Sequence, residues 1–105
     1  MVRIDAVSVY ELEYAESEFV SELIRLADVL DFSFNVYCSV DCTIEIRYIM
    51  NQESLEVVHT ETKSVIGGTF NTINSLVKSS HVIFAVVDIA YNPCELQCQG
   101  FFNLL

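Results

Sequence analysis

Four cysteines stand in two equally spaced pairs, and they are the residues of this chain best suited to carry chemistry. Cys38 and Cys42 form the first pair, and Cys94 and Cys98 form the second. Four thiolates brought together would suit a zinc ion, which takes sulfur ligands in tetrahedral geometry. Both pairs lack the glycine that helps a turn to wrap around a metal, so buried thiols or disulfides are alternatives. The cysteines therefore support an alternative function, a small cytosolic metal-binding or thiol-redox protein.

Two histidines and one isolated aspartate are the remaining candidates for acid–base chemistry. His59 and His81 would supply a base for a cysteine nucleophile if the fold brought the side chains together. Asp88 follows an apolar run and needs a hydrogen-bond partner if it is buried. None of the three belongs to a local motif of a known reaction. We therefore expect no catalytic residue, no cofactor and no enzyme activity.

A glycine pair offers the one segment that is similar to a phosphate-binding loop. Gly67 and Gly68 precede Thr69, but the lysine of a P-loop is missing, and no Gly-x-Gly-x-x-Gly motif occurs in the chain. The chain has only five basic residues, and they are not clustered. The glycine pair therefore predicts a turn, and direct binding of nucleic acid through its phosphates is not expected.

The acidic residues are concentrated in the first part of the chain. Residues 1–62 contain 13 acidic residues against 3 basic ones, which accounts for the whole formal charge of -10, while residues 63–105 are neutral. A dense negative field repels nucleic acid and anionic lipid, and it attracts basic protein surfaces. The charge therefore predicts a basic protein target, such as a nucleic-acid-binding protein or complex, and no membrane partner.

The predicted contact surface is built from the acids nearest the amino terminus. Residues two apart on a strand lie about 6.6 Å from each other on one face, and residues four apart on a helix are neighbours. This spacing is of the same order as that of phosphates along a nucleic-acid strand, so the surface would mimic DNA. The expected partner-binding residues are Glu11, Glu13, Glu16, Glu18, Glu22 and Asp28. Aromatic anchors for the same contact would be Tyr10, Tyr14, Tyr37 and Tyr48, and the alternative for Tyr10, Tyr14 and Tyr48 is a place in the core.

Apolar periodicity predicts the elements that position these residues. Alternation over residues 4–14 predicts a strand with an acidic outer face. Apolar spacing over residues 17–31 predicts an amphipathic helix with Ser17 as its N-cap. Alternation over residues 32–38 and 42–50 predicts a β-hairpin with a three-residue loop, and a third strand follows at residues 55–62.

The second half of the chain predicts two further helices and one strand. A helix over residues 69–77 would begin at Thr69, and residues 82–91 are typical of a strand buried on both faces. A short helix over residues 93–99 would begin at Pro93 and stop at Gly100. The order is β-α-β-β-β-α-β-α, which predicts a single α+β domain over residues 1–105. Its antiparallel sheet of about five strands would have helices packed on one face.

Length and hydropathy limit the setting of this domain. The longest apolar run, residues 82–87, is too short to span a bilayer. The amino terminus lacks the features of a secretory signal, so we expect a cytoplasmic protein. The hydrophobic fraction of 52% and mean hydropathy of +0.41 are high for so charged a chain. Surplus apolar side chains favour a partner or homodimer interface, which an apolar tail at residues 101–105 would supply.

In size and composition the chain is similar to the mixed class of small acidic inhibitors. This class includes phage anti-CRISPR and anti-restriction proteins and the immunity proteins that neutralise bacterial toxins. The resemblance implies a cytosolic protein without catalytic activity that occupies a basic, nucleic-acid-binding surface of its target. Binding would proceed by electrostatic steering and then by burial of an apolar and aromatic centre. An inhibitor of this kind is therefore the main functional prediction.

Overall fold

β-Strands are the regular secondary structure of the part of the chain that the structure describes. The structure is a computed structural model that describes residues 3–15, 18–50, 53, 55–91 and 94–104, the first of these ranges by its backbone alone. No helix occurs in these ranges. The strands are β1 (Arg3–Ala15), β2 (Phe19–Val20), β3 (Ile24–Arg25), β4 (Val29–Cys38), β5 (Cys42–Ile49), β6 (Val57–Val65), β7 (Thr69–Leu76), β8 (His81–Val87) and β9 (Cys94–Leu104).

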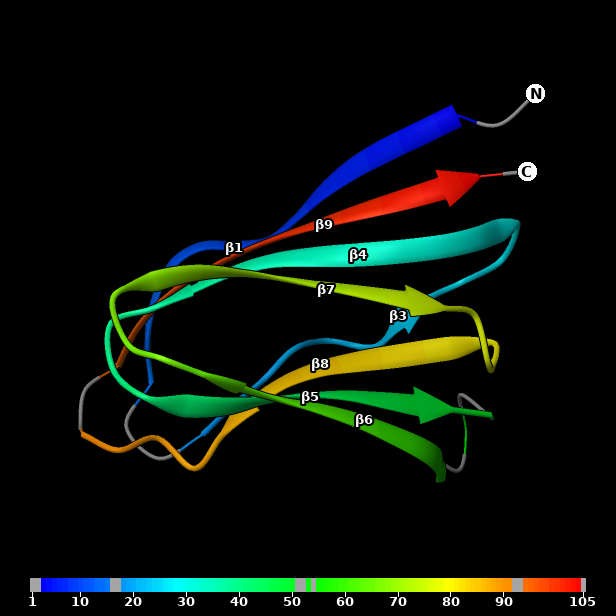
Figure 1. Cartoon of the computed structure of the whole chain (residues 1–105). Coiled ribbons are helices and arrows are strands. Elements are labelled where there is room, and N and C mark those ends of the chain that lie inside the picture. Colours follow the sequence, from blue (N-terminus) through cyan, green and yellow to red (C-terminus); the bar gives the residue numbers. More distant parts are fainter. Residues whose placement is uncertain (1–2, 16–17, 51–52, 54, 92–93, 105) are drawn as a thin grey trace.

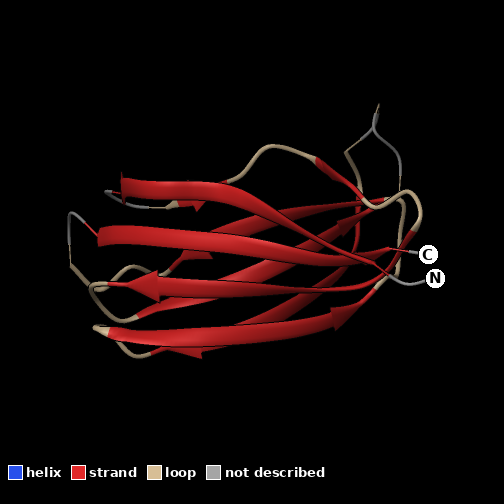
Figure 2. Cartoon of the chain, turned by 90° about the horizontal axis from the view of Figure 1, so that it is seen from above, coloured by secondary structure: helices blue, strands red, loops and turns tan. Residues whose placement is uncertain are grey.

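The strands form two antiparallel sheets that pack face to face. The first sheet has the order β1-β9-β4-β7, and the second has the order β2-β8-β5-β6, with β3 also paired to β8. Figure 1 shows the two sheets as layers, with the two ends of the chain at the same end of the molecule. The view turned by 90° in Figure 2 shows strands and connecting loops. The molecule is therefore a β-sandwich.

The connections between strands define a jelly roll. After β1 in the first sheet, the chain crosses to β2 and β3 in the second, returns to β4, and crosses again to β5. The hairpin from β5 to β6 stays in the second sheet, and β7, β8 and β9 then alternate between the sheets again. Because β2 and β3 share one position beside β8, the topology is that of an eight-stranded jelly roll.

The core lies between the sheets and is rich in aromatic side chains. Phe34 of β4 is in ring contact with Phe84 of the other sheet, at a centroid distance of 5.2 Å, and with Phe102 of β9, at 6.0 Å. Gly100 on β9 leaves room for these rings, because a Cβ atom there would lie 2.9 Å from the Phe102 ring and 3.1 Å from the Phe34 ring. A glycine inside a strand commonly marks such a close approach.

The prediction of an α+β fold is wrong, and the helix expected over residues 17–31 illustrates why. This segment contains β2, β3 and the start of β4. Phe19 and Ile24 pack against the core, and Leu26 is buried in it, although the segment is not a regular element throughout. The bends between the short strands bring residues at irregular spacing to one side, and that spacing imitates the period of a helix.

The other two expected helices are strands as well. Residues 69–77 contain β7. Of the four apolar residues that suggested one helical face, Ile73 and Val77 pack against the core, whereas Phe70 and Leu76 are 76% and 66% exposed. Residues 93–99 belong mostly to β9, in which Cys94, Leu96 and Cys98 are buried at alternate positions. The sequence of this segment does alternate with the period of two that is typical of a strand. The helix was predicted because Pro93 and Gly100 are typical of a helix start and a helix end.

Most of the predicted strands are confirmed, but the predicted hairpin between two of them is wrong. Strands are confirmed at residues 4–14, 32–38, 42–50 and 55–62, within one or two residues at most ends, and the buried strand ends at Val87 rather than at Tyr91. The expected hairpin between residues 32–38 and 42–50 is wrong, because β4 and β5 lie in different sheets. Gly67 and Gly68 form the predicted turn, which carries the chain from β6 to β7. The described residues include no helix capable of crossing a membrane.

Candidate ligand-binding face

The outer side of the first sheet presents an ordered set of polar and aromatic side chains. Because alternate residues of a strand point to opposite faces, residues opposite one another on β7, β4 and β9 form rows across the sheet. None of the residues in these rows is buried. The rows are Phe70, Tyr37 and Gln97; Thr72, Asn35 and Gln99; Asn74, Ser33 and Phe101; and Leu76, Asp31 and Asn103. We call these twelve residues the polar-aromatic face.

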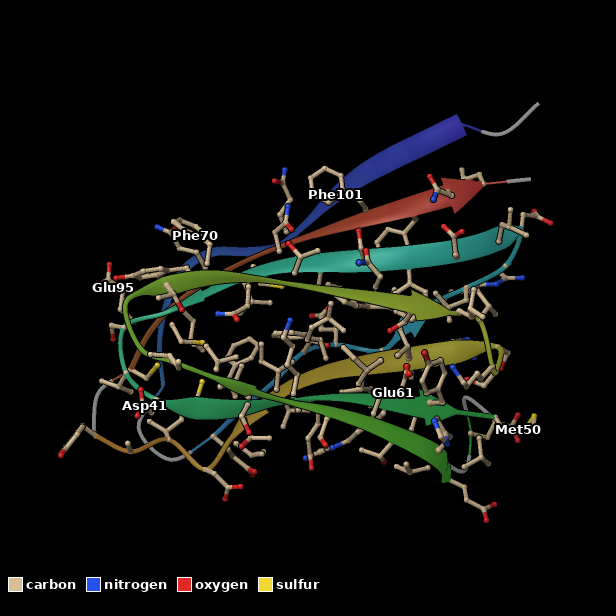
Figure 3. The ribbon with its side chains drawn as sticks, viewed as in Figure 1. Asp41, Met50, Glu61, Phe70, Glu95 and Phe101 are labelled. Atoms are coloured by element: carbon tan, nitrogen blue, oxygen red, sulfur yellow. The ribbon has the colours of Figure 1, made fainter. Side chains whose placement is uncertain are left out.

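Three aromatic rings lie on the polar-aromatic face. The Tyr37 and Phe70 rings contact each other at a centroid distance of 5.2 Å and an interplanar angle of 43°. Phe101 lies two rows away on β9, and Figure 3 shows Phe70 and Phe101 projecting from the side of their sheet that faces away from the core. Phe70 is 76% exposed, and the Tyr37 and Phe101 rings are partly exposed. The rings therefore identify this face as a candidate binding surface.

Amide and hydroxyl groups fill most of the remaining positions of the face. Thr72 Oγ1 donates a hydrogen bond to Asn35 Oδ1 at 2.7 Å, and Asn103 Nδ2 donates one to Asp31 Oδ1. Each side-chain amide offers both donors and an acceptor, and each hydroxyl offers both roles. Asp31 is the one charged residue among the twelve, so the face is nearly uncharged although the whole chain carries -10.

A depression lies at the Asp31 end of the polar-aromatic face. It has a volume of about 220 Å³ and lies where β4 and β7 run side by side. Both polar residues, such as Ser33 and Asn74, and apolar ones, such as Leu76, line it. The lining residues are Asp31, Phe32, Ser33, Asn74, Ser75 and Leu76. The face therefore ends in a shallow hollow with both polar and apolar walls.

The acidic residues predicted to bind a partner lie along a different part of the molecule. Glu18, Glu22 and Asp28 are exposed in the segment that contains β2 and β3. Glu11 and Glu13 belong to β1, of which the backbone alone is described, and Glu16 lies outside the described residues. Since β1 and β2 are outer strands at the edge opposite β7 and β6, these segments share one edge of the sandwich.

Of the four tyrosines proposed as anchors for that contact, Tyr37 lies on the polar-aromatic face and Tyr48 is fully buried. The side chains of Tyr10 and Tyr14 lie outside the described part of the structure. The sequence named Tyr37 only as an anchor for a protein partner, which stays a prediction, and it did not indicate Phe70 and Phe101, which were assigned to a helix and to an apolar tail. Alternation of polar and apolar residues through β9 was the signal that would have placed Phe101 on the outer face.

The four cysteines are buried and unpaired thiols. The thiol of Cys38 hydrogen-bonds Cys42, which with burial and the nearby Cys94 raises the pKa of Cys38 far above its usual value. The same bond lowers the pKa of Cys42, and burial raises the pKa of Cys98 to about 12. Among the described residues, no group of Cys, His, Asp and Glu side chains is arranged to hold a metal ion. The thiol-redox alternative stays a prediction.

The two histidines lie far from Cys38, Cys42 and Cys94, which are close to one another. His59 and His81 lie opposite Tyr48 and Ile49 at the end of β5, whereas Cys42 begins that strand. Six residues of strand separate these positions by about 20 Å. His81 Nδ1 is 2.8 Å from the Ser80 hydroxyl, and Asp88 is exposed beyond the end of β8. Neither histidine is therefore placed to activate Cys38, Cys42 or Cys94.

A polar cluster closes the side of the sandwich where β6 meets β7. The Tyr48 hydroxyl donates to Glu61 Oε1 at 2.6 Å, and the Leu76 carbonyl oxygen lies 3.0 Å from the same hydroxyl. Lys78 Nζ is 3.6 Å from Glu61 Oε2, and Figure 3 shows Glu61 between the two sheets. Burial favours a higher pKa for Glu61, but the bond from Tyr48, the nearby Ser75 hydroxyl and the charge of Lys78 outweigh it. The pKa of Glu61 therefore lies below its usual value.

Replacement of Tyr48 by phenylalanine is expected to lower the free energy of unfolding by about 2 kcal/mol at neutral pH, because Glu61 loses a charge-assisted hydrogen bond. A group whose pKa is lowered by folding stabilises the protein above its ordinary pKa, here 4.5, and this contribution is lost as the pH falls through the lower pKa of the folded state. The difference between Tyr48→Phe and the parent protein should therefore narrow in acid. Urea unfolding at several pH values measures it, with the exposed Tyr91→Phe as the control that should not change. A difference that widened in acid would contradict this account of Glu61.

Comparison with known proteins identifies the fold but no family. No protein-family model and no curated protein matches the sequence. Among solved structures, a Bacillus endospore appendage protein from a family of disulfide-linked pili has 12% identity and a TM-score of 0.60, over 99% of this chain and 88% of that one. The SPBc2 prophage-derived protein YomS has 12% identity and a TM-score of 0.63, over 98% and 95% of the two chains.

A third similar structure is the low-affinity xylan-binding module CBM86 from the gut symbiont Roseburia intestinalis. It has 14% identity and a TM-score of 0.52, over 100% of this chain and 96% of that one. At such identities the similarity is one of fold alone. The class defined here is therefore a jelly-roll β-sandwich, and the function must be argued from the side chains of this chain.

Proposed function

We propose that this protein is a binding module without catalytic activity that binds a neutral polysaccharide on the polar-aromatic face. The observation that carries the proposal is the contact at 5.2 Å between the exposed Phe70 ring and the partly exposed Tyr37 ring, with uncharged amide and hydroxyl groups in the neighbouring positions of the face. A sugar ring has one or two faces of C–H groups and an edge of hydroxyl groups. An aromatic ring covers the former, and amides hydrogen-bond the latter.

The charge distribution supports a neutral ligand over an ionic one. The polar-aromatic face lacks lysine and arginine, which recognise phosphate and carboxylate groups. Its one carboxylate, Asp31, would repel an anionic sugar. A basic protein partner would find little complementary charge here, since the exposed acids Glu18 and Glu22 lie on another part of the molecule. Neutral hydroxyl-rich ligands match the groups present.

The similar structures bear on this proposal in different ways. The xylan-binding module shares the fold, so a jelly roll of this size is compatible with binding of a polysaccharide. The endospore appendage protein comes from disulfide-linked pili, but the four cysteines of this chain are buried within its own core. Linkage of copies through these thiols would require the core to open. Polysaccharide binding is therefore the function that the geometry supports best.

Binding to polysaccharides is tested by affinity electrophoresis in gels that contain soluble xylan, a mixed-linkage glucan or a galactomannan. We expect retardation by at least one of these, and an affinity at least about tenfold lower for Phe70→Ala, which corresponds to 1.4 kcal/mol. Tyr91→Ala is the matched control, because Tyr91 is equally exposed and lies outside the polar-aromatic face. Equal retardation of the parent and Phe70→Ala proteins, or retardation by none of the gels, would contradict the proposal.

The acidic inhibitor remains a second candidate, favoured by the exposure of Glu18, Glu22 and Asp28 along one edge. Its binding surface would be this edge and its target a basic protein, so it does not require the aromatic residues of the polar-aromatic face. Binding of a polycation at low salt should then weaken when Glu18 and Glu22 are both reversed to lysine. An unchanged affinity would remove this candidate.

A further inference from the structure

We infer that the ligand of the polar-aromatic face is an extended chain of neutral sugar units that lies along β4, rather than a single sugar or a chain end. This inference rests on the proposed function and adds the length, direction and charge of the ligand. Along β4, the four rows of the face present first two aromatic rings, then polar side chains, then a third ring, and last the depression.

The aromatic groups of the face are too far apart for one sugar ring to contact them all. Tyr37 and Phe70 share the first row, whereas Phe101 lies opposite Ser33 in the third. Four residues along β4 separate Tyr37 from Ser33, a distance of about 13 Å. A ligand that covers both aromatic positions must therefore span several sugar units.

The row between the aromatic positions is polar. It contains Thr72, Asn35 and Gln99, and the hydrogen bond from Thr72 to Asn35 holds two of these side chains in place at 2.7 Å. Held side chains lose little rotamer freedom when a ligand binds, which favours affinity. The middle of an extended sugar chain would present its hydroxyl groups to this row.

The depression at the Asp31 end of the face would supply a further contact for a ligand that runs along β4. The depression of about 220 Å³ begins beside Ser33 and Asn74, in the row of Phe101, and continues to Asp31 and Leu76. A chain that starts at Phe70 and follows β4 would therefore reach this hollow last. The successive contacts are an aromatic pair, a polar row, a third ring and a hollow.

The charges near the ends of this path favour a neutral sugar. Asp31 lies in the last row, and Glu95 lies on β9 two residues before Gln97 of the first row. Neither end has a lysine or arginine among the described outward residues of β4, β7 and β9. A polymer of uronic acids would meet a carboxylate at each end, which is unfavourable.

Isothermal titration with a series of xylo-oligosaccharides and cello-oligosaccharides, from the monosaccharide to the hexasaccharide, tests the inference. We expect the affinity for one series to rise at least about tenfold between disaccharide and hexasaccharide, and polygalacturonate not to bind. Phe101→Ala should remove this gain, whereas Phe70→Ala should weaken binding of both the disaccharide and the hexasaccharide. Tyr91→Ala serves as the control, and thermal unfolding confirms that each variant is folded.

The outcomes separate this inference from the proposed function. Equal affinity for short and long oligosaccharides, still reduced by Phe70→Ala, would overturn the extended-chain inference and leave polysaccharide binding in place. Tight binding of polygalacturonate would overturn the assignment of a neutral ligand. Absence of binding to every saccharide, by a folded protein that also passes unretarded through the polysaccharide gels, would overturn both.

Discussion

Replacement of Phe34 by alanine is expected to lower the free energy of unfolding by about 3 to 5 kcal/mol, the range for removal of a buried phenylalanine ring. Phe34 has no exposed surface, and its ring contacts Phe32, Phe84 and Phe102 at centroid distances of 5.7, 5.2 and 6.0 Å. Phe84 belongs to the opposite sheet, so the ring connects the two layers of the sandwich. The cavity left by alanine would remove contacts from both layers at once.

Urea unfolding measures this loss, and Phe70→Ala provides a matched control. Both residues are phenylalanines on neighbouring strands, but Phe70 is 76% exposed and should leave the free energy of unfolding almost unchanged. The pair also separates stability from binding, because Phe70→Ala is the substitution expected to weaken polysaccharide binding. Equal destabilisation by the two substitutions would contradict the assignment of Phe34 to the core and Phe70 to the surface.

Replacement of Gly67 by alanine is expected to cost about 3 kcal/mol, at the upper end of the usual range for overpacking. A Cβ atom on Gly67 would lie 2.5 Å from the Val40 Cα atom and 2.7 Å from its carbonyl carbon. Both atoms are backbone, so no side-chain rotation relieves the clash. The backbone NH of Gly67 also donates to Asp41 Oδ1 at 2.7 Å, which ties the turn between β6 and β7 to the connection between β4 and β5.

Gly68→Ala is the control for this prediction, and thermal or urea unfolding compares the two. A Cβ atom on Gly68 would meet nothing within 4 Å, but the residue has a φ angle of +81°. Left-handed backbone costs a non-glycine residue about 1 kcal/mol. Gly67→Ala should therefore destabilise the protein more than Gly68→Ala. The opposite order would show that backbone strain, and not the contact between the two connections, makes this turn depend on glycine.

The strands that the sequence predicted correctly are those with a regular alternation of buried and exposed residues. In β5, for example, Ile44, Ile46 and Tyr48 are buried while Thr43 and Glu45 are only partly so. This pattern depends on the strand itself and on one apolar layer, so it can be read locally. The same reasoning failed for β7, because Phe70 and Leu76 are apolar residues on the outer face.

The candidate binding face could not be predicted from local pattern. Phe70, Tyr37 and Phe101 come from three strands that are distant in the sequence, and only the pairing of β7 and β9 with β4 places them on one surface. The acidic residues gave a stronger sequence signal because charge can be counted without a structure. Their prediction as a partner-binding surface stays untested, as does the predicted cytoplasmic location.

By itself the sequence determined the net charge of -10, most of the strand positions and the turn at Gly67 and Gly68, because these depend on composition and on neighbouring residues. Only the tertiary structure decided that no described residue is helical, that β4 and β5 belong to different sheets, and that Phe70 and Phe101 face outward. The physical reason is that a strand with apolar residues on both faces does not specify which face is buried. That choice depends on the packing partner, which long-range pairing supplies.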